Sequence, residues 1–95
     1  MSYTEEIVKS PLVRTTEELT HARNLARQIN RHVRSGKYAY AYFGGNDGDA
    51  TRFIRVKVQY FESEKWGDRY EFRVYSLATG KWVNLSAFTN IKLTS

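Results

Sequence analysis

Residues 15–36 have the sequence TTEELTHARNLARQINRHVRSG, which predicts a long amphipathic helix over about Thr16–Ser35. Thr15 and Glu18 have the spacing of a capping box, in which a hydroxyl and a carboxylate satisfy the first free backbone N–H groups of a helix. Gly36 suits the left-handed position that ends many helices. At about 100° per residue the aliphatic side chains form one stripe that should face a core: Leu19, Ala22, Leu25, Ala26, Ile29 and Val33.

The same segment carries the charge imbalance of the chain. The 95 residues include 15 Lys and Arg against 10 Asp and Glu, which gives a formal net charge of +5. Between Leu19 and Asn46 there are five basic residues and no acidic one, so the whole excess lies there. A helix that exposes only cations repels itself unless a negative group approaches it. The five basic residues are Arg23, Arg27, Arg31, Arg34 and Lys37.

The four helix arginines share one face, about 16 Å long, on the side away from the aliphatic stripe. Guanidinium groups suit bidentate contacts to phosphate, so this face is predicted to bind nucleic acid, a nucleotide or another phosphate-bearing ligand. Lys37 belongs to it, and Arg52, Arg55 and Lys57 are expected extensions. Two alternatives stay open: an acidic protein partner, or a solvated face paired with acids such as Asp47, Asp49, Glu62 and Glu64.

From Lys37 onward the sequence predicts β-strands. Tyr38-Ala39-Tyr40-Ala41-Tyr42 alternates strictly, and GGNDGD at 44–49 has the composition of a hairpin tip. Further strands are expected at 51–61, 69–77, 82–86 and 90–93. Short sequential strands favour a meander, and a sheet of this size tends to curl into a small barrel.

The predicted fold is therefore α+β in a single domain, with an N-terminal helix packed on a five-stranded antiparallel SH3-like or Sm-like barrel. Residues 1–14 are expected to form a short helix and a connection, because Ser2-Tyr3-Thr4-Glu5 also fits a capping box and Pro11 disfavours helix before it. Residues 15–36 form the basic helix and residues 37–95 the barrel.

Two groups of strand residues have competing interpretations. Tyr38, Tyr40 and Tyr42 would stack bases if they lay on an exposed face. The favoured interpretation is that they pack the barrel core or a cross-strand ladder, with Ala39 and Ala41 allowing the helix to approach closely. Cations on neighbouring strands would either extend the basic surface or, as favoured, pair across strands with acids. These cations are Arg52, Arg55, Lys57 and Arg73, and the acids are Glu62, Glu64 and Glu71.

Other functional classes find little support in the sequence. The absence of cysteine excludes disulfides and thiolate metal sites. No apolar run has the length of a membrane span, and Met1–Lys9 lacks the apolar region of a signal peptide, so a cytoplasmic location without a membrane partner is expected. His21 and His32 lack a third ligand and are interpreted as partly buried helix residues, so no metal or cofactor is expected. No catalytic motif appears, which predicts a non-enzymatic protein of open oligomeric state.

Residues 72–85, FRVYSLATGKWVNL, followed by Ile91-Lys92, resemble the end of a WYL-type domain. More narrowly, Gly36–Leu93 is similar to the small, mostly phage-encoded proteins related to that domain. The resemblance implies an Sm-like or SH3-like barrel and the cytosol of a bacterial host. It adds two alternative functions, an accessory protein that binds an acidic surface of a host protein and a WYL-like nucleotide sensor. Val83 stands where the family has an arginine, so the ligand pocket is not carried over.

Overall fold

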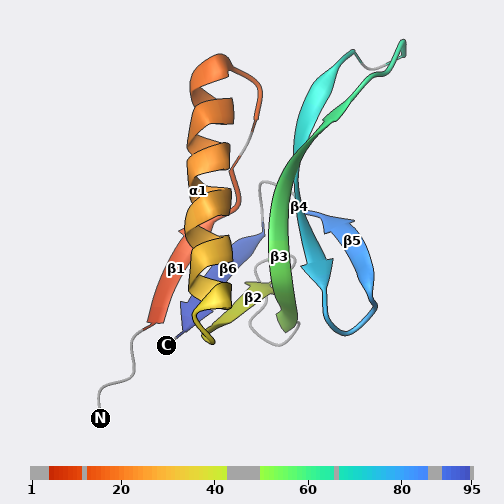
Figure 1. The fold of residues 1–95 in the computed structure, drawn as a ribbon. Helices are drawn as coiled ribbons and strands as arrows, with labels where there is room; N and C mark the ends of the chain where they lie inside the picture. Colours follow the sequence, from red (N-terminus) through yellow and green to blue (C-terminus); the bar gives the residue numbers. More distant parts are fainter. Residues whose placement is uncertain (1–4, 12, 43–49, 66, 86–88, 95) are drawn as a thin grey trace.

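The computed structural model describes residues 5–11, 13–42, 50–65, 67–85 and 89–94, and it contains one helix packed on one face of an antiparallel sheet (Figure 1). The six strands have the order β1-β6-β2-β3-β4-β5. The helix is α1 (Thr16–Arg34), and the strands are β1 (Glu5–Lys9), β2 (Tyr38–Tyr42), β3 (Ala50–Phe61), β4 (Arg69–Ser76), β5 (Lys81–Asn84) and β6 (Asn90–Thr94).

Helix α1 confirms the predicted bounds and capping. The Thr15 hydroxyl accepts from the Glu18 backbone N–H at 3.1 Å, and the Glu18 carboxylate accepts from the Thr15 N–H at 3.1 Å. After the C-cap Ser35 the chain turns at Gly36, whose φ of 88° is the left-handed conformation that favours glycine. Within the described part of the chain, no helix combines the length and apolar character that a membrane span requires.

The core lies between α1 and the sheet. Ala22, Leu25, Ala26 and Ile29 are the buried residues of the helix, and they belong to the expected aliphatic stripe. Small residues at the contact let the helix approach the strands closely, and each large side chain buried there contributes about 1.5–3 kcal/mol. Their buried neighbours on the sheet side are Ala39, Ala41, Phe53, Val56, Phe72, Val74, Leu85, Ile91 and Leu93.

The expected meander is confirmed for β2 to β5, in which each strand pairs with the next. The last strand departs from it, because β6 returns to pair with the other side of β2. β1 and β5 then lie at the two edges of the sheet, and no pairing in the described residues joins them. The sheet is therefore open there, in contrast to the closed barrel that was expected. The tip predicted at 44–49 lies outside the described residues.

The short helix predicted for residues 1–14 is wrong where the structure describes it. Glu5–Lys9 forms β1, which pairs along its whole length with β6, from Glu5 opposite Thr94 to Lys9 opposite Asn90. The capping box was a local signal, and a few residues of helix are marginal by themselves. Pairing with β6 gives this segment the backbone hydrogen bonds of a strand, and the local sequence contains no sign of that distant partner. Residues 1–4, which carry most of that box, lie outside the described residues.

The β3–β4 hairpin gives the molecule its length. β3 is the longest strand, and its far half runs with β4 alongside α1 to the level of the helix's first turn, where the hairpin diverges from the helix (Figure 1). The principal extents are 51 × 25 × 22 Å. A bulge interrupts the pairing between Phe53 and Arg55, so that Ile54 is an extra residue on β3. This bulge lies beside α1 and positions the surface described next.

Candidate anion-binding surface

The four arginines of the predicted binding face are all exposed, but the structure divides them among different surroundings. The guanidinium of Arg23 lies 5.8 Å from the centre of the Tyr70 ring. Arg27 and Arg34 line a pocket against β3. Arg31 lines none of the described pockets, and Lys37 is exposed directly after the helix. The centre of the candidate site is therefore the pair Arg27 and Arg34.

The pocket between α1 and β3, here called the arginine pocket, has a volume of about 400 Å³. Asn30 fixes its two walls against each other. The Asn30 amide donates to the Val56 carbonyl oxygen at 2.9 Å, and its oxygen accepts from the Val56 N–H at 2.8 Å. Both bonds are made to the backbone of β3 next to the bulge, so they fix the position of α1 along that strand. The lining residues are Arg27, Asn30, Arg34, Ile54 and Arg55.

Three guanidinium groups in this pocket have no counter-charge from the described residues. An ion pair among the described residues joins Arg69 and Glu71 on β4, at 2.8 Å, away from this pocket. Glu62 and Glu64 lie with Asp68 around a separate pocket at the far end of the β3–β4 hairpin. These two glutamates are among the acids expected to pair with the helix arginines, and the structure shows no ion pair between them. Asp47 and Asp49, the other proposed partners, lie outside the described residues.

A second hollow adjoins the arginine pocket and shares Ile54 and Arg55 with it. It has a volume of about 290 Å³, and Tyr75 and Trp82 complete its lining, so it is called the ring pocket below. Lys57 lies beside it, with its ammonium 4.1 Å from the centre of the Trp82 ring. Sequence reasoning named Arg55 and Lys57 but missed the two rings. The tight turn predicted at 78–81 could have revealed them, because a hairpin at that turn places Tyr75 opposite Trp82.

The tyrosine row of β2 lies outside the core, so the core half of the favoured interpretation is wrong, and two of the rings instead contact cations of neighbouring strands. Ala39 and Ala41 are fully buried on the helix side, as expected, whereas Tyr38 is 44% exposed and the other two rings are half-buried. The rings lie on the opposite face of the sheet, where cations cover two of them. The Arg52 guanidinium is 4.2 Å from the Tyr38 ring centre, and the Lys92 ammonium is 5.5 Å from that of Tyr42. Such contacts stabilise a cation modestly at an exposed site.

The favoured cross-strand ion pairs are also wrong for the described residues. Arg52, Arg55 and Lys57 form no ion pair with Glu62, Glu64 or Glu71. Arg73 instead donates to the Gln59 amide oxygen at 3.0 Å and to the Trp82 carbonyl oxygen at 3.3 Å. Between strands on this face the described cations therefore contact rings and polar groups, whereas the Arg69–Glu71 ion pair joins two residues of the same strand.

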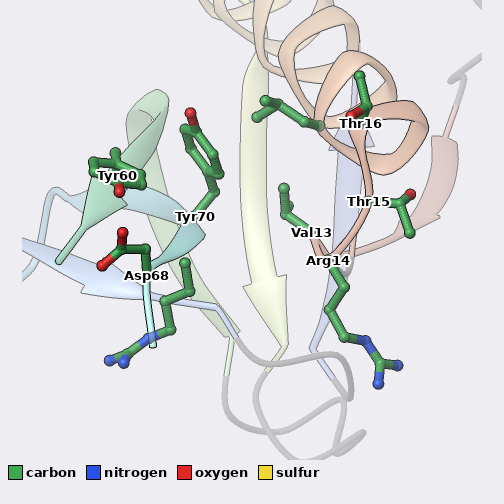
Figure 2. A pocket seen from close by; sticks show the side chains of 9 residues that line it. Val13, Arg14, Thr15, Thr16, Tyr60, Asp68 and Tyr70 are labelled. Atoms are coloured by element: carbon green, nitrogen blue, oxygen red, sulfur yellow. The ribbon is translucent and has the colours of Figure 1, made fainter. Parts of the chain in front are cut away.

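The largest of the described pockets, about 580 Å³, lies at the other end of α1 and is called the cap pocket (Figure 2). Figure 2 shows Tyr60 and Asp68 side by side on the strand side, opposite the first residues of the helix. A hydrogen bond from the Tyr60 hydroxyl to the Asp68 carboxylate, with lesser burial and charge effects, raises the pKa of Tyr60 to about 12. The phenol is therefore fully protonated near neutral pH. The lining residues are Val13, Arg14, Thr15, Thr16, Leu19, Tyr60, Asp68, Arg69 and Tyr70.

The two histidines have different surroundings. His32 is half-buried, and its Nε2 lies 3.0 Å from the Tyr38 carbonyl oxygen and 2.8 Å from that of Thr94. Because carbonyl oxygens only accept, Nε2 carries a proton and ties the end of α1 to β2 and β6. His21 is exposed, so its predicted partial burial is wrong. In the described residues, no three His, Asp or Glu side chains gather into a group that could hold a metal ion.

Comparison of the chain with known protein families, with curated proteins and with solved structures finds no match. The geometry of the surface is therefore the basis for any functional conclusion.

Proposed function

We propose that the chain is a non-enzymatic binding module that contacts the phosphates of nucleic acid through the arginine pocket. The observation that carries the proposal is that Arg27 and Arg34 from the helix and Arg55 from β3 line one pocket with no carboxylate of the described residues beside them. Arg23, Arg31 and Lys37 extend the positive surface along the helix, and Lys57 extends it along the strand.

The physical argument rests on like charges brought together by the fold. Guanidinium groups that share a small pocket repel one another, and the repulsion destabilises the free protein slightly. A phosphate can accept two parallel N–H bonds from one arginine, and its negative charge offsets the repulsion among the group. Binding of this kind is mainly electrostatic, weakly selective for sequence and strongly dependent on salt.

The test compares a triple variant, Arg27→Ala, Arg34→Ala and Arg55→Ala, with the unaltered protein. Fluorescence anisotropy with labelled oligonucleotides is measured over a series of salt concentrations. Loss of three phosphate contacts is expected to weaken binding at low salt and to reduce the slope of log K against log salt by about 2 to 3.

The matched control removes the same charge elsewhere, with Lys9→Ala, Arg14→Ala and Lys65→Ala. These residues are exposed and lie outside the arginine and ring pockets. A control that retains most of the affinity is expected. Equal losses in both triple variants, or no binding of any nucleic acid at low salt, would overturn the proposal. A pull-down partner that survives nuclease treatment would instead indicate an acidic protein.

Kinship with WYL-related phage proteins also stays a proposal. Its support is the strand, turn and strand at residues 72–85, which are β4, a turn at Gly80 with φ 66°, and β5. The Sm-like or SH3-like barrel remains a prediction of that kinship. A solved structure of such a phage protein tests it: the same strand order, with β6 returning beside β2, would support the relationship, and a different order would contradict it.

A further inference from the structure

The ring pocket adds a base-binding site to the arginine pocket, and we propose that the two together select single-stranded nucleic acid. This inference rests on the proposed function, since it takes the phosphates of the same ligand to the arginine pocket. Its own basis is the hollow lined by Ile54, Arg55, Tyr75 and Trp82, about 290 Å³ in volume, at the small end of ligand pockets. That size suits one planar base rather than an extended ligand.

The rings that form this pocket are held by the β4–β5 hairpin. Tyr75 lies opposite Trp82 in the strand register, and their ring centres are 5.5 Å apart with the planes at 77°. In a T-shaped contact the edge of one ring meets the face of the other, so the pair covers only one ring face. Lys57 covers one face of Trp82. Both rings are only half-buried, so surface remains for a further planar group.

The bulge in β3 supplies the third wall. Ile54 is the extra residue at the bulge, and its side chain is 40% exposed, although it is aliphatic. Ile54 and Arg55 line both pockets, so the arginine pocket and the ring pocket are neighbours on one continuous surface. A nucleotide can therefore place its phosphate among the arginines and its base against the rings. Positive charge beside aromatic rings is the usual chemistry of single-strand binding surfaces.

A duplex cannot use the second site. Its bases are paired and stacked inside the helix, and exposing one costs a few kcal/mol of free energy. Single strands present unstacked bases without that cost. The phosphates of either form can reach the arginines, so the preference for single strands must come from the ring pocket.

The experiment distinguishes the contribution of the bases to binding affinity from that of the phosphates. Anisotropy is measured with four labelled ligands at one low salt concentration: single-stranded DNA, single-stranded RNA, a hairpin duplex, and an abasic DNA strand of equal length. The unaltered protein is expected to bind both single strands about tenfold or more tightly than the abasic strand, from the contribution of base stacking. The two single-stranded ligands also show whether the sugar matters.

Trp82→Ala provides the matching protein change. It is expected to bind the intact single strand as weakly as the unaltered protein binds the abasic strand, and to bind the duplex with little change. Trp82→Phe, which keeps a ring, is expected to retain most of the preference and guards against loss of folding. Equal affinity of the unaltered protein for intact and abasic strands would overturn the base site, because that comparison needs no variant. If the triple arginine variant still lost binding, the proposed function would stand.

Discussion

Helix α1 forms one pocket with the sheet at its first turn and another towards its last turns, and the two differ in the source of their counter-charges. In the cap pocket Asp68 accepts from Tyr60, and Arg69 pairs with Glu71. In the arginine pocket Arg27, Arg34 and Arg55 find no acid among the described residues. The pocket at the first turn of the helix thus contains a carboxylate of the protein itself, that of Asp68. The other end gains most from a negative group that arrives from outside.

Giving the arginine pocket its own carboxylate should remove this difference. Ile54→Glu places an acid at an exposed position that lines the pocket, so the guanidinium groups gain an internal partner and an approaching phosphate meets a negative charge. Nucleic-acid affinity at low salt is expected to fall on the order of 100-fold. Binding titrations at low and high salt measure the effect, which should shrink as salt screens the charges.

Ile54→Gln is the control for that substitution, because it has nearly the same shape without the charge. It also removes the aliphatic wall of the ring pocket. A modest loss of affinity is expected from Gln. If Gln and Glu weakened binding equally, the loss would come from the altered ring pocket alone. The difference in charge between the two ends of α1 would then have no effect on binding.

The second prediction concerns the clamp that holds the arginine pocket together. Asn30→Ala removes two hydrogen bonds and leaves the Val56 N–H and carbonyl without their partner, so unfolding should become easier by about 1–3 kcal/mol. Urea denaturation measures this loss. Asn24→Ala, at an exposed position of the same helix, should be neutral or slightly stabilising because alanine favours helix. Equal effects of the two changes would show that Asn30 does not fix the helix to β3.

The smallest effect at neutral pH is expected at the cap pocket. Asp68→Asn removes the main cause of the raised Tyr60 pKa, so the pKa should fall from about 12 towards 10.0. The raised pKa stabilises the folded state below pH 10, and this contribution is lost as the pH rises from 10 through about 12. Ultraviolet titration of the phenol follows the change, with Tyr60→Phe identifying its signal.

Glu62→Gln is the comparison for Asp68→Asn, since Glu62 is a lesser cause of the same pKa shift. It should lower the pKa of Tyr60 less than Asp68→Asn does. Nucleic-acid affinity at neutral pH should change by no more than about twofold in Asp68→Asn, because salt screens charges on distant exposed groups. A large change in affinity would mean that the cap pocket takes part in binding.

The sequence predicted best what depends on neighbouring residues. The capping box of Thr15 and Glu18, the left-handed Gly36 and the buried helix stripe all follow from local spacing, and each is confirmed. Alternation in β2 also predicted two faces correctly. It also predicted that the alanines meet the helix, as they do, but not that the tyrosine face would lie outside the core, because that depends on whether the sheet closes on itself.

Features that depend on pairing between distant segments were missed. β1 is a strand only because β6 lies beside it, and the bulge at Ile54 appears only in the register of β3 with β4. The same holds for the candidate site. Arg27 and Arg34 could be assigned to one helix face, but their meeting with Arg55 depends on how α1 lies along β3. The composition of the candidate site therefore depends on contacts between distant segments, which local sequence patterns do not reveal.

The position of β6 constrains how the chain acquires its structure. β6, residues 90–94, lies between β1 and β2 and pairs with both. Neither pairing can form until residues 90–94 have been synthesised, long after β1 and β2. Until then β1 has no partner, and one side of β2 presents open backbone groups. Such late, non-local closure slows folding and exposes strand edges in the meantime. During synthesis the nascent protein therefore holds an incomplete sheet that another strand can occupy, and its final assembly follows the arrival of Asn90–Thr94.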